Sequence, residues 1–124
     1  MADNRIRPLN CMRSPCPVAC TLDILGDKWT LLVVRDLFVG KKTYGEFQKS
    51  PEKIPTNILA DRLKRLLEFG IISKTPYQQN PLRYEYSLTV KGRELGPILK
   101  AMVAWGEKHV PGSKALMQPA NPNS

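Results

Sequence analysis

Three cysteines near the start of the chain are the residues whose type and spacing could carry covalent chemistry. Cys11, Cys16 and Cys20 all fall within the first twenty residues. Cys16 directly precedes a proline at which a helix can begin, and Arg13 is close by in the sequence. A helix N-terminus and a nearby cation both lower a thiol pKa and favour the reactive thiolate. This placement favours Cys16 as a sensor of oxidants or electrophiles, with Cys11 as its disulfide partner within one subunit or across a dimer.

The same cysteines allow other interpretations. Cys20 could be a small buried apolar side chain, which is common for a free cysteine. The odd number of cysteines argues against a framework of structural disulfides. A closed zinc site needs four ligands, and the single histidine, His109, lies at the far end of the chain. We therefore expect no metal and no cofactor.

Residues for catalysis do not form a recognisable set. With one histidine, no glycine-rich phosphate loop and no Cys-x-x-Cys motif, the chain offers no combination of nucleophile, base and orienting group. Asp23 and Asp27 could share a face, but Asp27 is placed to cap the helix that follows it. We expect a protein that is not an enzyme.

The charge balance indicates a polyanionic partner. The chain has 124 residues, of which 19 are Lys or Arg and 11 are Asp or Glu, giving a net charge of +8. Nine basic and four acidic residues lie between residues 41 and 83. Such an excess is typical of proteins that meet nucleic acid, and less often of those that meet an anionic membrane. The longest aliphatic run, residues 31–34, is far too short to span a membrane, and residues 1–8 hold no apolar signal segment. We expect a cytoplasmic protein without a membrane partner.

Hydrophobic periodicity and capping residues divide the chain into elements that could position these groups. The pattern predicts helices over 17–25, 28–38, 44–49 and 57–69, strands over 71–77 and 83–88, and a last helix over 90–108. Pro97 should kink that last helix, because it lacks a backbone N–H. We expect one domain over 15–110, with a flexible arm at 1–14 and a flexible tail at 111–124.

This order of elements predicts an α+β fold of the winged helix-turn-helix class, with three short helices, a β-hairpin wing and a C-terminal helix suited to dimerisation. The helix at 57–69 would bury Leu59, Leu63 and Leu66 and offer its other face to the DNA major groove. Candidate groove contacts on or beside it are Thr56, Asn57, Ala60, Asp61 and Lys64. Candidate phosphate contacts are Lys41, Lys42, Lys49, Lys53 and Arg83. Arg62 could reach a phosphate or tie its helix to an acidic neighbour.

Several short sequence motifs occur in a fixed order between about residues 16 and 109. They are Cys16-Pro17, Leu25-Gly26-Asp27-Lys28-Trp29, residues 58–66 with Gly70-Ile71-Ile72, residues 86–95, and Trp105-Gly106. Together they resemble the HxlR-type winged-helix transcriptional regulators, relatives of MarR. The resemblance implies a homodimeric repressor or activator, held together by its first and last helices, with residues 56–69 in the major groove and 71–88 as the wing. Some members of that family sense electrophiles or oxidants through a cysteine at the Cys-Pro position.

Apolar residues on the first and last predicted helices exceed the needs of one small core. These residues are Val18, Leu22, Met102 and Trp105. Pairing them across a two-fold axis would bury them, and would set two recognition helices about one DNA turn, or a multiple of it, apart. The expected partner is then double-stranded DNA with a near-palindromic operator; the sequence identifies no effector. The alternative is a winged-helix module that binds protein or RNA without duplex specificity.

Overall fold

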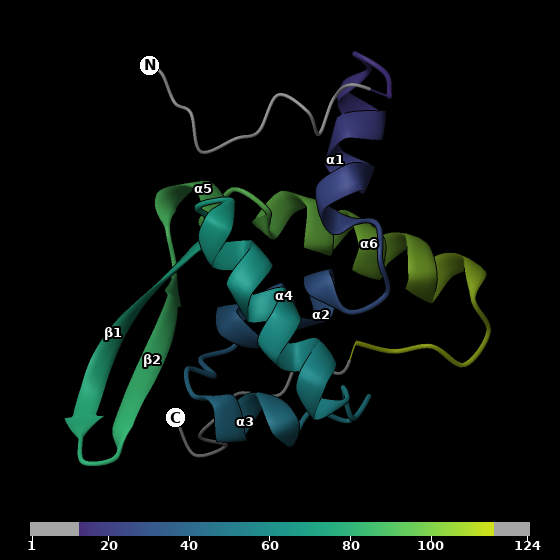
Figure 1. The fold of residues 1–124 in the computed structure, drawn as a ribbon. Coiled ribbons are helices and arrows are strands. Elements are labelled where there is room, and N and C mark those ends of the chain that lie inside the picture. Colours follow the sequence, from purple (N-terminus) through teal and green to yellow (C-terminus); the bar gives the residue numbers. More distant parts are fainter. Residues whose placement is uncertain (1–12, 116–124) are drawn as a thin grey trace.

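The structure is a computed structural model, and it describes residues 13–115. Its helices and strands are, in chain order, α1 (Pro17–Leu25), α2 (Thr30–Phe38), α3 (Tyr44–Gln48), α4 (Thr56–Glu68), β1 (Ile72–Gln79), β2 (Leu82–Leu88), α5 (Val90–Arg93) and α6 (Gly96–His109). Figure 1 shows α4 crossing in front of α2, with the two strands beside it, α1 above and α6 behind. The arrangement is the α+β winged helix-turn-helix fold that the sequence predicts.

The core forms where α2, α3 and α4 meet the base of the two strands. Its buried apolar residues include Val33, Val34, Phe47, Leu59, Leu63, Leu66, Ile71 and Ile72. Three of them follow the predicted stripe of α4, so burial of that stripe holds the helix with its other face outward.

Side-chain hydrogen bonds hold the backbone at the start of α3 and in the turn before α2. The capping box of α3 is present: Thr43 Oγ1 accepts from the Glu46 N–H at 3.2 Å, and Glu46 Oε1 accepts from the Thr43 N–H at 3.1 Å. Asp27 accepts from the N–H groups of Trp29 and Thr30 at 3.0 and 3.1 Å. Residues 27–29 therefore form a capped turn, and α2 begins two residues later than predicted.

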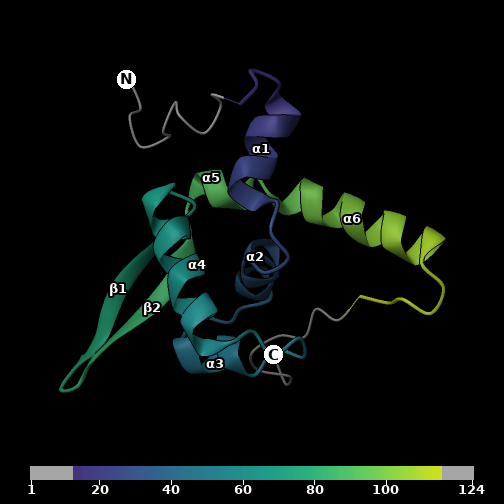
Figure 2. The same cartoon turned by 45° about the vertical axis from the view of Figure 1, so that its right-hand side comes forward.

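The two strands form an antiparallel hairpin that projects from the body of the molecule (Figures 1 and 2). Pairing runs from Ile72 opposite Leu88 to Gln79 opposite Leu82, and the register is irregular between Pro76 and Gln78. The strands extend further than predicted, so that only Asn80 and Pro81, joined by a cis peptide bond, separate them.

The base of this hairpin is held tightly. Thr89 Oγ1 donates to the Gly70 carbonyl at 2.6 Å, and its backbone N–H donates to the Ile71 carbonyl at 3.0 Å. Gly92 in α5 approaches the Ile71 carbonyl so closely that an added Cβ would lie 2.2 Å from the oxygen. A residue with a side chain at position 92 would push α5 away from the strand.

The single helix predicted over 90–108 is wrong. The chain forms α5, passes through a turn at Glu94 and Leu95, and begins α6 at Gly96. Pro97 lies in the first turn of α6, where a missing N–H costs no hydrogen bond. It therefore starts a helix instead of kinking one.

The predicted arm falls almost entirely on residues 1–12, outside the described residues, and so does the tail from residue 116. The part of the tail that is described is bonded to α6. Ser113 Oγ donates to the Gly106 carbonyl at 2.8 Å, and the Ala115 N–H donates to Glu107 at 3.3 Å. Contacts of the domain thus continue beyond the expected boundary at 110. Among residues 13–115, no helix has the length and apolar character to cross a membrane.

Candidate nucleic-acid interface

The outward face of α4 is polar and exposed. Thr56, Asn57, Ala60, Asp61 and Lys64 are all exposed, as expected from a helix whose opposite face is buried. The helix has 13 residues, so it offers more than three turns of exposed surface. In Figure 2 it lies beside the hairpin, and both are reachable from the same side of the molecule.

Asp27 connects the start of α2 to α4. Besides its two backbone donors, its carboxylate accepts from Arg62 Nε at 2.8 Å and from the Thr30 hydroxyl. Arg65 Nη1 lies 3.9 Å from the other carboxylate oxygen. Partial burial disfavours the charged form, but the hydrogen bonds from Arg62, Thr30 and Trp29 outweigh it and hold the pKa of Asp27 well below its usual range.

These contacts bear on the two roles left open for Arg62. Its guanidinium is bonded to Asp27 on α2 and to Asp61 on its own helix, and one fifth of its side chain is exposed. The structure therefore supports the tie to an acidic neighbour. We treat Arg62 as a residue that positions α4, not as a phosphate contact.

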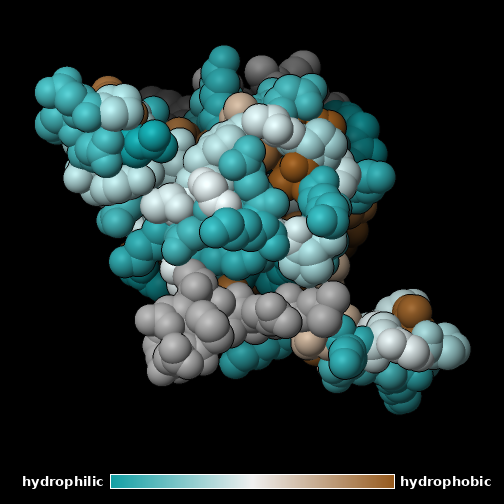
Figure 3. All heavy atoms as spheres, turned by 90° about the horizontal axis from the view of Figure 1, so that it is seen from below, coloured by the Kyte–Doolittle hydropathy of each residue, from teal (hydrophilic) through white to brown (hydrophobic). Residues whose placement is uncertain are grey.

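The five basic residues expected to meet phosphates divide into two groups. Lys42, Lys49, Lys53 and Arg83 are exposed. Lys41 is buried, and its ammonium donates to Ser50 Oγ at 3.0 Å and lies 3.9 Å from Asp36. The expectation for Lys41 is wrong, because an ammonium enclosed by the protein cannot reach a phosphate. The underside of the molecule, where α3 lies, is mostly hydrophilic (Figure 3).

The hairpin adds a second exposed surface. Gln79, Asn80 and Arg83 are exposed at its tip. Tyr77 and Leu82 are also about half exposed there, although sequence reasoning gave neither a role. The irregular register at Tyr77 could not be read from the sequence alternation.

Sequence reasoning also missed a buried ion cluster at the other end of α2. Arg35 donates to Asp36 and, through both terminal nitrogens, to Glu52 at 2.7 and 2.8 Å. The Ser50 hydroxyl donates to Asp36, which also lies near the Lys41 ammonium. These hydrogen bonds raise the pKa of Arg35 and lower that of Glu52. The sequence feature that could have indicated this cluster is the Arg35-Asp36 pair inside a helix that is otherwise apolar.

Cys16 is a free, exposed thiol at the N-cap position of α1. Hydrogen bonding to the backbone N–H groups of Ala19 and Val18 lowers its pKa, so the predicted direction is right. The sequence also suggested Arg13 as a nearby cation that lowers this pKa. That expectation is wrong, because Arg13 pairs with Asp23 at 2.6 Å. Cys11 lies outside the described residues.

Two further expectations concern Cys20 and metal binding. Cys20 is disulfide-bonded, so it is not the free buried cysteine that was expected. Among residues 13–115, no three His, Cys, Asp or Glu side chains converge on a point where a metal ion could bind.

The four residues expected at a dimer interface are exposed in the isolated chain. Val18, Leu22, Met102 and Trp105 are 67, 55, 52 and 64% exposed, respectively. Trp105 lies against the ring of His109 at 4.9 Å between centroids. Their place in a dimer interface stays a prediction.

Comparison with known proteins places these features in a family. Residues 24–114 match the model of the HxlR-like helix-turn-helix family. The chain is 44% identical over 94 residues to the HTH-type transcriptional regulator YdeP of Bacillus subtilis, which covers 76% of this chain and 73% of YdeP. Four other curated relatives are longer, and the chain spans 59–64% of their length.

Solved structures of transcriptional regulators have the same fold as this chain. The reduced form of the redox regulator HypR superposes with a TM-score of 0.71 at 38% identity, covering 77% of this chain and 95% of HypR. The reduced transcriptional regulator YodB of B. subtilis superposes with a TM-score of 0.65 at 28% identity, covering 80% of this chain and 98% of YodB. With its hairpin, its exposed α4 and these relatives, the chain belongs to the HxlR-like helix-turn-helix family of DNA-binding transcriptional regulators.

Proposed function

We propose that the chain is a sequence-specific regulator that binds duplex DNA as a homodimer, with α4 in the major groove and the hairpin on the adjacent backbone or minor groove. The observation that carries this proposal is the attachment of α4. Its apolar stripe is buried, Arg62 ties it to Asp27, and the face left outward holds Asn57 and Lys64. A helix held this way can offer base-reading groups without first paying an ordering cost.

In this proposal the side chains divide the work. Asn57 reads a base edge through its amide, near the start of the helix. Lys42, Lys49, Lys53 and Arg83 neutralise phosphates and release counterions. Asp61 is exposed and paired with Arg62, and its negative charge does not attract DNA. It is therefore part of the exposed face of α4 but not a DNA contact.

The test is selection of bound fragments from genomic DNA, followed by titration of the selected duplex at several salt concentrations. We expect near-palindromic fragments and an affinity that falls steeply with salt. Asn57→Ala should cost about 1–3 kcal/mol of binding free energy and relax selection at one base position.

Lys108→Ala is the matched control, because Lys108 is an exposed lysine at the end of α6, away from α4 and the hairpin. It should leave the affinity unchanged, whereas Lys49→Ala should weaken binding to every sequence and reduce the salt dependence. Equal binding of duplex and single-stranded RNA, or no duplex binding in dilute buffer, would instead favour the protein- or RNA-binding alternative.

The proposed homodimer uses the exposed apolar residues of α1 and α6. Burying Trp105 and Met102 against a second copy removes from water the largest apolar side chains that the isolated chain leaves exposed there. Trp105→Glu should convert a dimer to monomer at micromolar concentration in sedimentation velocity. Val90→Glu is the control, because Val90 is equally exposed but lies on α5.

We also propose that Cys16 is a redox sensor. Its exposed thiol and lowered pKa support this role, and the redox regulator HypR has the same fold. Diamide should change the duplex affinity of the wild type and leave that of Cys16→Ser unaltered. The same diamide response in both proteins would refute the role of Cys16.

A further inference from the structure

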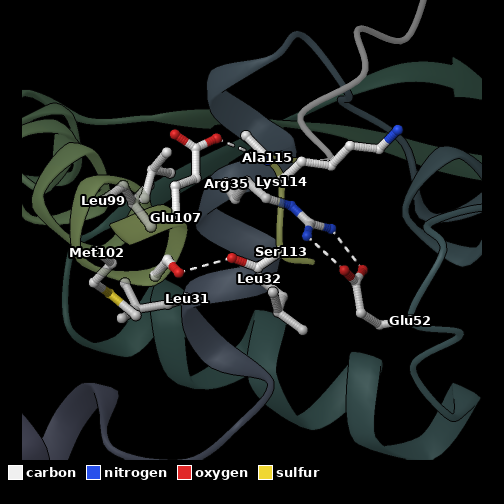
Figure 4. A pocket seen from close by; sticks show the side chains of 12 residues that line it. Leu31, Leu32, Arg35, Glu52, Leu99, Met102, Glu107, Ser113, Lys114 and Ala115 are labelled. Carbon is white, nitrogen blue, oxygen red and sulfur yellow. Dashed lines mark hydrogen bonds and ion pairs between the residues drawn. The ribbon is translucent and has the colours of Figure 1, made fainter. Parts of the chain in front are cut away.

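A cavity of about 280 Å³ lies between α2, α6 and the segment that follows α6. Figure 4 shows Leu31, Leu99 and Met102 on one side of it, and Arg35 and Glu52 on the other. The residues proposed to contact DNA do not line it. Its volume is just below the range of about 300–1,000 Å³ for small-molecule sites, which suits a compact ligand.

The charged wall of this cavity already binds a carboxylate. The side chain of Arg35 is nine-tenths buried, and its two terminal nitrogens hold the two oxygens of Glu52. Planar, two-bond pairing of this kind is the strongest and most specific way in which a guanidinium recognises a carboxylate. Arg35 keeps its other partner, Asp36, at 2.9 and 3.1 Å.

The two carboxylates on Arg35 differ in how readily they can be replaced. The Asp36 side chain is 6% exposed and also accepts from Ser50. The Glu52 side chain is 31% exposed and comes from the loop between α3 and α4. If Glu52 turns outward, water solvates its charge, whereas Asp36 has no such alternative.

We propose that this cavity binds a small organic carboxylate with an apolar body, and that the ligand takes the place of Glu52 on Arg35. The apolar body would lie against Leu31, Leu99 and Val103, and removal of that surface from water supplies the affinity. Exchange of one carboxylate for another leaves the charge around Arg35 unchanged. An amine or an uncharged amide cannot make this exchange.

Displacement of Glu52 also affects α4, and this step rests on the DNA-binding function proposed above. Glu52 precedes the first residue of α4, Thr56, by four positions, and its bonds to Arg35 tie the intervening loop to α2. Without that tie the start of α4 is less firmly placed. Occupation of the cavity therefore weakens binding to the duplex.

The first test uses calorimetry on the full chain without DNA, with 2-naphthoate as the probe. We expect 2-naphthoate to bind about tenfold or more tightly than 2-naphthamide or 2-naphthylmethylamine, because only a carboxylate can replace Glu52 in its paired bonds to Arg35. No binding of 2-naphthoate, or equal binding of the three compounds, would overturn the proposal.

Two variants test the exchange at Arg35. Glu52→Gln should raise the affinity for 2-naphthoate about tenfold, since the competing group keeps its shape and loses its charge. The control is Glu94→Gln, because Glu94 is an exposed carboxylate in the turn between α5 and α6 and does not line the cavity. It should leave the affinity unchanged, and an equal gain in both variants would reduce the effect to general electrostatics and refute the exchange.

The second test titrates the selected duplex with and without saturating 2-naphthoate. We expect the duplex affinity to fall by about fivefold or more, and by linkage the duplex should weaken 2-naphthoate by the same factor. An unchanged duplex affinity with the probe bound would refute the connection to α4. If the ligand-free chain binds no duplex, the proposed function fails, and calorimetry still decides the carboxylate site independently.

Discussion

Two ion networks hold the recognition unit to α2, one at each end of that helix. At the start of α2, Asp27 is partly exposed and joins Arg62 in the middle of α4. At its end, Arg35 and Asp36 are buried and join Lys41, Ser50 and the loop before α4. The first rests on one carboxylate with many donors, whereas the second holds charges of both signs away from water.

Because of this difference, the first network should mainly orient α4, whereas the second should mainly stabilise the folded domain. A partly exposed network can lose one member and let water take its place, so its loss should mainly misplace α4. A buried network that loses one member leaves uncompensated charge inside the protein. We therefore expect damage at Asp36 to threaten the whole domain and damage at Arg62 to be milder.

Removal of Asp36 should have the largest effect. Asp36→Ala leaves Arg35 and Lys41 buried without their shared partner, and should lower the free energy of unfolding by about 3–5 kcal/mol. Urea unfolding followed by circular dichroism measures the change. A loss below about 1 kcal/mol would abolish the distinction between the two networks.

Arg62→Ala should have an intermediate effect. It removes the 2.8 Å bond to Asp27 but leaves the backbone donors of Trp29 and Thr30 in place. The free energy of unfolding should fall by about 1.5–3 kcal/mol, as for hydrogen bonds to charged groups. Duplex affinity should fall too, and Arg62→Lys should restore only part of both. If stability falls while duplex affinity stays the same, Arg62 does not position α4 for DNA.

The exposed network should also respond to acid. Because the pKa of Asp27 is held below its usual range, its ionised form stabilises the native state at pH values above about 4, the ordinary Asp pKa. That contribution is lost as the pH falls through the depressed native pKa. The difference in free energy of unfolding between wild type and Asp27→Asn should therefore shrink as the pH is lowered from about 5. A difference that is constant with pH would show that the charge of Asp27 is irrelevant.

Asp61→Ala should have the smallest effect. Asp61 pairs with Arg62 on the same helix, but 54% of its side chain is exposed. Exposed pairs of this kind contribute about 0–1 kcal/mol, and urea unfolding should detect a change at the lower end of that range. A change as large as that of Arg62→Ala would place Asp61 inside the network instead of at its edge.

Local rules predicted the parts of the fold that depend on neighbouring residues. The bounds of α1, the capping box of α3 and the exposed face of α4 follow from caps and from the 3.6-residue period. The lowered pKa of Cys16 followed from its place at a helix N-terminus, although Arg13 is engaged elsewhere.

Features that depend on distant contacts were missed. Lys41 resembles any surface lysine until Ser50 and Asp36 are brought beside it. Arg35 and Asp36 lie inside an otherwise apolar helix, and Glu52, the partner of Arg35, is far along the chain. The sequence around Pro97 does not show whether this proline lies in the middle of a helix or in its first turn. The turn at residues 94 and 95 places it in the first turn of α6.

The clamped base of the hairpin makes it a lever. Gly92 and Thr89 fix one end against the start of β1, while the turn between β1 and β2 stands free of the body in both views. A rigid rod held at one end magnifies any tilt of its support into a larger sweep at its tip. A side chain at position 92, as in Gly92→Ala, would thus re-aim Arg83 from a distance, without altering a single atom of the tip itself.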